Sequence, residues 1–308
     1  MYDIIGDIHG YAKELKLLLE KLGYTLCDGV YQHETRQVLF IGDYIDRGPE
    51  IKETLDIVKA MVDKGNAIAL MGNHEYNAIM FHVEDQNGGH LRDHSIKNIL
   101  QHYETLKAFK GKQEEFDHYI EWFKTLPLFY ENEHFRAVHA AWNYSSIAFL
   151  KQIASNGILP QEELYASIHC HTPLNEAVDV TLKGLELDLP EGQFFYDNDQ
   201  FIRHHIRIKW WENPAGHHYQ SIAVHPKDEY PTYAIEKPFE NYKPEDKPVF
   251  FGHYWLKENE PALLKPNVCC VDYSVALGQY LTAYRFEPGL PLSNDHFVFQ
   301  KVVPRTEE

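Results

Sequence analysis

The sequence of 308 residues predicts an α/β fold, because two strand–loop–helix units follow one another at its start. In each unit a short apolar run typical of a buried strand leads into a glycine-containing loop, and apolar residues at helical spacing come next. A third apolar run and a further glycine-containing loop follow directly. Because crossover connections between parallel strands are right-handed, we expect the loops after these strands to meet at one edge of a sheet.

The individual elements follow from the spacing of apolar residues. The first unit is predicted to be a strand over residues 2–5 and a helix that ends at Gly23, with an apolar face formed by Leu15, Leu18, Leu19 and Leu22. The second unit is predicted to be a strand over residues 37–41 and a helix up to Gly65, with an apolar face formed by Ile51, Leu55, Val58 and Val62. A third strand is predicted over residues 67–71.

The middle of the chain departs from this pattern. From about residue 82 to about residue 125 the sequence is rich in histidine and has helical periodicity, so we predict an inserted helical cap. A further helix is predicted over residues 144–168. We predict a loop-rich elaboration over about 170–248, because this region has an acidic stretch at 185–200 and a proline-rich stretch at 225–248.

Two more strands are predicted to end at histidines. Residues 135–138 precede His139, and residues 249–251 precede Gly252 and His253. A final antiparallel sheet is predicted from runs that alternate β-formers with turn residues, at 267–272, 280–286 and 296–303. We therefore expect a single domain over residues 1–308, elaborated by the helical cap and by the loop-rich region.

The composition argues against several classes of protein. The formal net charge is −17, from 29 Lys and Arg against 46 Asp and Glu, so we do not expect an extended nucleic-acid-binding surface. An anionic substrate would have to be attracted locally, most simply by bound cations. No signal peptide or membrane-spanning run is recognised, and the four cysteines have no zinc-type spacing. These features favour a cytoplasmic protein with reduced thiols.

Most of the functional information lies in four short motifs. They are Gly6-Asp7-Ile8-His9-Gly10, Gly42-Asp43-Tyr44-Ile45-Asp46-Arg47-Gly48, Gly72-Asn73-His74-Glu75 and Phe251-Gly252-His253. Each motif follows a predicted strand, so the topology should bring them together. Aspartate, asparagine and histidine are suitable ligands for divalent metal ions, and a site with two metal ions needs one oxygen ligand that bridges them. Asp43 is the best candidate for that bridge.

The remaining ligands divide between the two ions. We expect Asp7, His9 and Asp43 to hold the first ion, since flanking glycines let the backbone bring Asp7 and His9 to one point. The second ion is expected to bind a set that shares the bridging carboxylate, namely Asp43, Asn73, His139 and His253. Mn or Fe is the expected metal, and Zn, Ni and Co also suit these ligand types.

In this order, GDIHG, GDYIDRG and GNHE resemble motifs of the calcineurin-like metallophosphoesterase superfamily, in particular its branch of phosphoprotein phosphatases and diadenosine tetraphosphate hydrolases. The resemblance covers the first 75 residues closely and the regions of His139 and His253 more loosely. It implies a β-sandwich flanked by helices and the same metal ligands. It also implies that His74 is a general acid oriented by Asp46, and that neither residue is a metal ligand.

A two-metal site of this kind implies in-line attack on phosphorus by a hydroxide that the two ions share. His74 would protonate the departing oxygen, because a carboxylate hydrogen-bonded to its imidazole fixes the tautomer and favours the cation. Arg47 would hold a phosphate oxygen through bidentate hydrogen bonds.

Two positions differ from the protein phosphatases of this family. Met71 stands directly before GNHE, where those enzymes usually have arginine, and alanines follow His139 where they typically have two glycines. The missing phosphate contact has three candidates elsewhere in the chain, Arg92, Arg203 and Arg207. Trp210 and Trp211 are candidates for stacking a nucleobase, although aromatic residues in such numbers usually belong to a core.

The segment around His253 resembles the bacterial diadenosine tetraphosphate hydrolases more than the eukaryotic phosphatases, through Phe251-Gly252-His253-Tyr254-Trp255 and the later Val271-Asp272 and Gly278. We therefore predict a metal-dependent phosphoesterase that acts on phosphoprotein or on small phosphorylated molecules. One alternative is a dinucleoside polyphosphate hydrolase, for which the same machinery is suitable. The alternative from another class is a phospholigand- or protein-binding module with a vestigial site.

Overall fold

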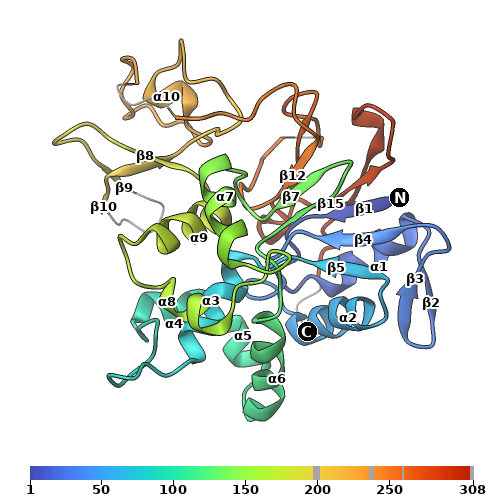
Figure 1. Ribbon diagram of the computed structural model, residues 1–308. Coiled ribbons are helices and arrows are strands. Elements are labelled where there is room, and N and C mark those ends of the chain that lie inside the picture. Colours follow the sequence, from blue (N-terminus) through green and yellow to red (C-terminus); the bar gives the residue numbers. More distant parts are fainter. Residues whose placement is uncertain (197–201, 236–238, 259, 306–308) are drawn as a thin grey trace.

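The computed structural model describes residues 1–196, 202–235, 239–258 and 260–305 (Figure 1). Its helices are α1 (Ala12–Lys21), α2 (Ile51–Asp63), α3 (Asn73–His82), α4 (Ile96–Gln101), α5 (Tyr103–Ala108), α6 (Gln113–Phe123), α7 (Tyr144–Ile153), α8 (Gln161–Ala166), α9 (Pro173–Lys183) and α10 (Tyr219–Ile222), with short 3₁₀ turns at Val275–Leu277 and Asn294–His296. Its strands are β1 (Tyr2–Ile5), β2 (Thr25–Cys27), β3 (Val30–Gln32), β4 (Gln37–Phe40), β5 (Ala67–Ala69), β6 (Phe129–Glu131), β7 (Arg136–Val138), β8 (Glu186–Asp188), β9 (Phe195–Tyr196), β10 (Ile202–Arg203), β11 (His205–Arg207), β12 (Val249–Phe251), β13 (Val268–Cys270), β14 (Asp272–Tyr273), β15 (Tyr280–Phe286) and β16 (Phe297–Lys301).

The larger sheet contains the parallel strands predicted at the start of the chain. Its strand order is β14-β15-β1-β4-β5, and β16 pairs with β15. Strands β1, β4 and β5 are parallel, whereas β15 runs antiparallel to β1, β14 and β16. The predicted α/β class is confirmed. The C-terminal strands β15 and β16 are antiparallel as predicted, but they extend this sheet instead of forming one of their own.

A smaller sheet, of strand order β13-β12-β7-β6, packs against the larger one. Within it β12 is parallel to both β7 and β13. Aromatic rings fill the space between the sheets: Phe250 of β12 lies 5.6 Å from Phe286 and 5.3 Å from Tyr284, both on β15, between ring centroids. Phe135 lies 4.9 Å from the same Phe286. The two sheets therefore form the β-sandwich that the resemblance implied.

The predicted run over residues 267–272 was wrong in one respect, because it belongs to two sheets. Strand β13 pairs in parallel with β12 in the smaller sheet, and only β14 joins the larger sheet. The chain changes sheets at Val271, whose N–H donates to the carbonyl oxygen of Phe251 at 2.8 Å. All the side chains of both strands are buried, so alternation of apolar and polar residues could not distinguish the two pairings.

The predicted helix over residues 144–168 is also interrupted. It consists of α7 and α8, separated by a turn in which Asn156 and Gly157 have φ values of 51° and 83°. Glycine and asparagine tolerate this left-handed conformation, which ends a helix. Pro160 then stands immediately before α8. The β2–β3 hairpin was not predicted at all, although the Asp28-Gly29 turn is a known hairpin signal.

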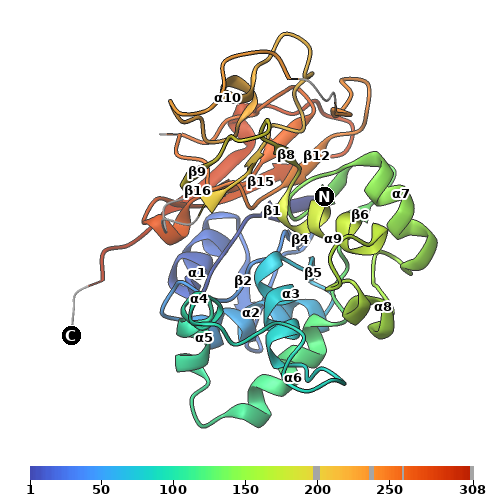
Figure 2. The same ribbon diagram turned by 90° about the vertical axis from the view of Figure 1, so that its left-hand side faces the viewer.

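Helices cover the sandwich, and the two elaborations lie at opposite ends of it. Both views show α6 at one end of the molecule and α10 at the other (Figures 1 and 2). Helix α6 packs against α3, and α9 packs against α7. The region predicted to be loop-rich contains α9, α10 and the short pairs β8–β11 and β9–β10 among its described residues. Among the described residues, none of the helices combines the length and the apolar composition needed to cross a bilayer.

Candidate metal centre

The predicted ligands lie at the carboxyl ends of five strands drawn from both sheets. Asp7, Asp43 and Asn73 follow β1, β4 and β5 of the larger sheet, and Asn73 is the first residue of α3. His139 and His253 follow β7 and β12 of the smaller sheet. Ligands of α/β folds are usually bound at this edge, because parallel strands bring their loops together there.

The carboxylate of Asp43 lies at the middle of the arrangement and is only 1% exposed. His9 Nε2 lies 3.6 Å from Asp43 Oδ2, and His139 Nε2 lies 3.4 Å from Asp43 Oδ1. His74 Nε2 lies 3.9 Å from Oδ2. The two oxygens of this carboxylate therefore face different histidines, an arrangement that suits a bridging ligand.

Two groups of side chains place their ligand atoms within 4.8 Å of one another, and Asp43 belongs to both. One group is His9, Asp43 and His74, and the other is Asp43, His139 and His253. Asn73 adjoins the second group, since its Oδ1 lies 3.1 Å from His139 Nε2. The structure thus brings His9 and Asp43 together in one group and Asp43, His139 and His253 in the other, whereas Asp7 is in neither group and His74 joins the first.

Asp7 is held beside the second group by the backbone. The N–H of His253 donates to both carboxylate oxygens of Asp7, at 3.2 and 3.1 Å. Asp7 is buried, and the charges of Asp272, His139 and Asp43 act on it. Asp7 is therefore fixed against the loop that carries His253, at the junction of the two sheets.

The donor atoms suit metal ions, because several buried nitrogens have no other partner. His9 Nε2 and both ring nitrogens of His253 are buried without a hydrogen bond among the described residues. The other nitrogen of His9 is 2.9 Å from the carbonyl oxygen of Ile45, and His139 Nδ1 is 3.0 Å from that of Ile41. A carbonyl acceptor at Nδ1 keeps the ring proton on that nitrogen, so the lone pair of Nε2 points towards the carboxylates. A lone pair and a carboxylate repel each other unless a cation lies between them.

The protonation states of the buried carboxylates and imidazoles also favour the binding of cations. Burial together with the charges of Asp272 and Asp43 raises the pKa of Asp7 well above its usual value. Burial lowers the pKa of His9 to about 4, and burial and the charge of Arg207 lower that of His253 well below its usual value, so both imidazoles are neutral and able to coordinate. Crowded buried carboxylates repel one another unless positive charge lies between them.

His139 and Asp43 attract each other strongly in the absence of a metal ion. Burial alone would lower the pKa of His139, but the charge of Asp43 outweighs burial and raises it to about 10. Burial alone would raise the pKa of Asp43, but His139 and His74 outweigh it and hold that pKa well below its usual value. Asp43 is therefore ionised, and a metal ion bound to His139 would displace a proton from it.

His74 and Asp46 form a hydrogen-bonded pair beside Asp43. His74 Nδ1 lies 2.5 Å from Asp46 Oδ2, and the backbone N–H of His74 donates to Asp43 Oδ1 at 3.0 Å. Burial opposes the charged imidazole, but Asp43 and Asp46 outweigh it and raise the pKa of His74 above its usual value. The pair thus favours a protonated imidazole whose free nitrogen faces the ligand groups.

Arg47 lies at the exposed side of the site. Its guanidinium carbon is 5.4 Å from the ring centroid of Trp255, and that ring lies 6.0 Å from the ring of His9. Trp255 is partly buried and has a φ of 50°, and its N–H donates to Asp272 Oδ2 at 2.6 Å. Arg47 and Trp255 therefore stand together at the edge of the first ligand group.

The structure adds residues that we did not predict. His102 Nδ1 and Thr105 Oγ1 lie 2.8 and 2.5 Å from Asp46 Oδ1. Glu75 accepts hydrogen bonds from the N–H groups of Asp43, Tyr44 and Gly72, at 2.8, 2.8 and 3.0 Å, and thus fixes the loop that carries Asp43. Glu75 stands inside the third motif, so its position was a usable signal; His102 and Thr105 have no motif around them.

The proposed substitutes for Met71 differ in their surroundings. Arg92 is partly buried, its Nη2 donates to Gln101 Oε1 at 2.9 Å, and it forms no ion pair with a described carboxylate. The charge of Asp46 acts on Arg92. Arg203 is exposed on β10, and Arg207 lies 3.8 Å from Glu186. Of the three, Arg92 is the one on which the charge of Asp46 acts, which places it near the His74–Asp46 pair.

The tryptophans considered for base stacking belong to the core. Trp210 and Trp211 are 2% and 3% exposed, and their rings lie 4.9 and 5.2 Å from Phe251. Neither ring offers a free face to a ligand.

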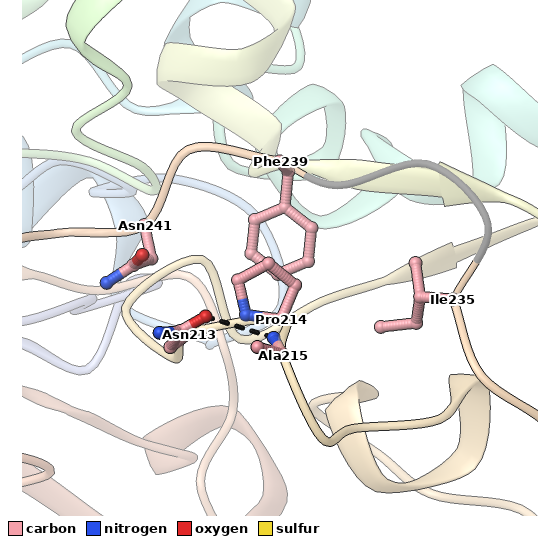
Figure 3. A pocket seen from close by; sticks show the side chains of 6 residues that line it. All are labelled: Asn213, Pro214, Ala215, Ile235, Phe239 and Asn241. Atoms are coloured by element: carbon pink, nitrogen blue, oxygen red, sulfur yellow. Dashed lines mark hydrogen bonds between the residues drawn. The ribbon is translucent and has the colours of Figure 1, made fainter.

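A pocket of about 350 Å³ lies within the loop-rich elaboration (Figure 3). Its lining consists of Asn213, Pro214, Ala215, Ile235, Phe239 and Asn241. The Asn213 side chain accepts a hydrogen bond from the N–H of Ala215 at 3.0 Å. None of these residues belongs to the ligand groups, so the pocket is separate from the metal centre.

Replacing Gly252 by alanine should disturb Asp7. A Cβ at position 252 would lie 2.1 Å from Asp7 Oδ1, so the carboxylate would have to move. We expect metal affinity to fall by about 10- to 100-fold, the range seen when a ligand loses its orientation. Metal titration of the purified variant measures this. Gly65→Ala is the control, because Gly65 has a φ of 74° and no atom near its Cβ position; it should lower stability but not metal affinity. Equal metal affinity in both variants would contradict the role given to Asp7.

The chain is similar to proteins of known family. It is 36% identical over 129 residues to bis(5'-nucleosyl)-tetraphosphatase PrpE (asymmetrical) of Oceanobacillus iheyensis, covering 41% of this chain and 50% of that protein. The chain thus spans only half the length of this relative.

Solved structures show the same fold at low sequence identity. A protein serine/threonine phosphatase from Saccharomyces cerevisiae has a TM-score of 0.51 at 13% identity, covering 100% of this chain and 81% of that chain. The cold-active protein-tyrosine phosphatase of a Shewanella species has a TM-score of 0.51 at 14% identity, covering 98% and 80%. The model of the calcineurin-like phosphoesterase family matches residues 2–254, which is well over half of the sequence. The chain therefore belongs to the calcineurin-like phosphoesterase family.

Proposed function

We propose that the protein is a metal-dependent phosphoesterase that hydrolyses phosphate esters of proteins or small molecules. The observation that carries the proposal is the pair of ligand groups that share Asp43, with the His74–Asp46 pair next to them. Asp7, His9, Asp43, Asn73, His139 and His253 are the proposed metal ligands, and Mn or Fe is the proposed metal. Asp46, Arg47 and His74 are the proposed residues for proton and phosphate.

Two metal ions in this site would neutralise phosphoryl oxygens and lower the pKa of a water molecule, so that a strong nucleophile is available at neutral pH. The protein's own part is to hold the substrate and to donate a proton. His74 Nδ1 is occupied by Asp46, so Nε2 is the atom that donates a proton to the departing oxygen. The raised pKa of His74 keeps that proton in place until the bond to phosphorus breaks.

Arginines supply the remaining phosphate contacts in this proposal. Arg47 is exposed beside His9 and His74, whose pKa values its charge lowers, so its guanidinium is close enough to act on a phosphate bound there. Arg92 lies near Asp46, whose charge acts on it, and is the second arginine proposed to contact the phosphate. An arginine fork binds two phosphate oxygens at once, which orients the phosphoryl group for in-line attack.

Replacing Arg92 by alanine is expected to raise KM about tenfold, because a charge-assisted contact to phosphate is lost. The change in kcat should be smaller, since Arg92 does not touch the ligand groups. Steady-state kinetics measures both. Arg203→Ala is the matched control on exposed β10 and should leave KM unchanged. A larger effect at position 203 or at Arg207 than at position 92 would assign the phosphate contact there.

A second candidate is a dinucleoside polyphosphate hydrolase. It is favoured by the similarity to the tetraphosphatase of Oceanobacillus iheyensis and by the His253–Trp255 loop, where Trp255 is held by Asp272 beside the metal ligands. The same ligand groups can act on a phosphoanhydride bond, because its leaving group is also a phosphate oxygen.

The decisive experiment compares substrates. The Mn²⁺-supplemented protein is incubated with diadenosine tetraphosphate, with a panel of phosphopeptides and with para-nitrophenyl phosphate, and the products are identified. Hydrolysis of phosphopeptides supports the phosphoesterase, and preferential cleavage of diadenosine tetraphosphate supports the second candidate. The absence of turnover with all three would favour a binding module with a vestigial site. Elemental analysis of protein purified without chelator identifies the metal.

We also propose a cytoplasmic location, which is supported by free thiols at Cys27, Cys170, Cys269 and Cys270.

A further inference from the structure

The helical segment over residues 82–125, which carries α4, α5 and α6, reaches the His74–Asp46 pair. His102 lies between α4 and α5 and is 3% exposed. Its Nδ1 donates to Asp46 Oδ1 at 2.8 Å, and the hydroxyl of Thr105 on α5 donates to the same oxygen at 2.5 Å. The backbone N–H of Asp46 in turn donates to Thr105 Oγ1 at 3.0 Å. This segment therefore contacts the side chain that orients the proposed proton donor.

We propose that His102 is a positioning residue, which holds the carboxylate of Asp46 so that Asp46 can orient His74 for proton transfer. This inference rests on the proposed function, in which His74 protonates the departing oxygen. It gives the inserted helical segment a part in the reaction and not only in packing.

The first argument concerns the freedom of the Asp46 carboxylate. Its Oδ2 binds His74, and its Oδ1 binds His102 and Thr105. A carboxylate with one oxygen bound can rotate about the bond to its β-carbon, whereas one held at both oxygens has a fixed plane. Fixing Oδ1 therefore fixes Oδ2, and with it the direction from which His74 Nδ1 is held.

The second argument concerns the backbone. Asp46 and Arg47 have φ values of 66° and 67°, in the left-handed region that residues with a side chain rarely adopt. Such a conformation persists when surrounding contacts enforce it. Thr105 binds both the N–H and the side chain of Asp46, so the helical segment provides these contacts.

The third argument is that His102 is itself held in one orientation. Its Nε2 lies 3.2 Å from His82 Nε2, at the end of α3. Its ring lies 5.3 Å from that of Phe81 and 6.0 Å from that of Phe116, between centroids. With Nδ1 donating to Asp46 and Nε2 in contact with His82, both ring nitrogens of His102 are held. Burial lowers the pKa of His82 to about 4, so His82 is neutral in this contact.

A buried histidine could instead serve only to fill space, and the two roles predict different kinetics. Loss of packing lowers the amount of active protein for every substrate alike. Loss of orientation at the proton donor lowers the rate of hydrolysis most for a poor leaving group, because such a group needs a proton in the transition state. The rate falls least for a good leaving group. Phenyl phosphate and para-nitrophenyl phosphate provide this pair, because phenolate is the poorer leaving group.

The experiment uses His102→Leu and His102→Asn in the full-length, metal-loaded protein. Leucine keeps a similar volume but removes the donor, whereas asparagine is smaller but places an amide N–H at the position of Nδ1. We expect His102→Leu to lower kcat about tenfold on phenyl phosphate and less than about threefold on para-nitrophenyl phosphate. His102→Asn should stay within about twofold of the unmodified protein on both. Phe109→Leu is the packing control, because Phe109 is buried at the end of α5 with its ring against those of Phe116 and Tyr119, and it should show no dependence on the leaving group.

A spectroscopic measurement tests the same contact without turnover. The short His74 Nδ1–Asp46 hydrogen bond should give a downfield proton resonance in protein loaded with diamagnetic Zn²⁺. We expect this resonance to be lost or broadened in His102→Leu and retained in His102→Asn.

Other results would overturn the inference. Equal losses of His102→Leu on both esters, together with an unchanged resonance, would show a packing role only, and full activity of His102→Leu on phenyl phosphate would show no role. If the unmodified protein hydrolyses neither ester, the proposed function fails, while the resonance still decides whether His102 positions the pair.

Discussion

Replacing Asp43 by asparagine is expected to reduce phosphoesterase activity about a thousandfold or more and to lower the metal content of both ligand groups. Asp43 is the residue that the two groups share, and its oxygens lie 3.6 and 3.4 Å from His9 and His139. The charge stabilisation that bound metal ions supply is several kcal/mol, and about 4 kcal/mol corresponds to a thousandfold in rate. An amide keeps the shape of the side chain but loses the charge that attracts both ions.

Elemental analysis and steady-state kinetics on the same preparation check this result. Asp63→Asn is a matched control, because Asp63 is an exposed carboxylate that pairs with Lys59 at 2.7 Å on α2, so activity and metal content should remain unchanged. A variant of Asp43 that still binds two ions per chain would contradict the bridging role. Loss of a single ion would place Asp43 in one group only.

Replacing His74 by asparagine is expected to lower kcat by about 10²- to 10⁴-fold, the range that general acid catalysis contributes. Metal content should stay near that of the unmodified protein. His74 Nδ1 is occupied by Asp46, and its backbone N–H, which the substitution keeps, donates to Asp43 Oδ1 at 3.0 Å. The loop that carries Asp43 therefore keeps its support while the proton donor is lost.

His74 also lies within ligand distance of His9 and Asp43, so the experiment distinguishes two roles for it. Activity that falls while metal content is unchanged identifies a proton donor. Parallel loss of metal and activity would instead make His74 a ligand of the first ion. His134→Asn, at an exposed histidine, controls for the substitution itself.

Those parts of the site that lie at strand ends could be predicted from the sequence. The strands over residues 2–5 and 249–251 occur as predicted, because short apolar runs with polar or glycine neighbours leave little freedom in their assignment. Parallel pairing of β1 with β4 brings Asp7 and Asp43 to one edge of the larger sheet, and the packing of the two sheets brings His253 to Asp7, although these two residues are far apart in the sequence. Local patterns and topology together were sufficient for these side chains.

The contacts of Asp46 could not be predicted in this way. His102 and Thr105 lie 56 and 59 residues after Asp46, in a segment with no strand register to fix their position. They reach Asp46 through the packing of short helices, which depends on side-chain shape and not on periodicity. The same limit applies to β13 and β14, where uniformly buried residues are compatible with either sheet. Trp210 and Trp211 were candidates either for stacking a nucleobase or for the core, and their burial places them in the core.

The contact between Asp7 and His253 joins residues that are 246 positions apart. During synthesis, Asp7 leaves the ribosome long before His253 exists, and the strand β12 that carries His253 must pair with β7 before the two meet. A metal ion that needs both loops can therefore bind tightly only to a nearly complete chain. Metal acquisition would then be a late step in biogenesis, and nascent or truncated chains would carry the aspartates of the first motifs without retaining the ion.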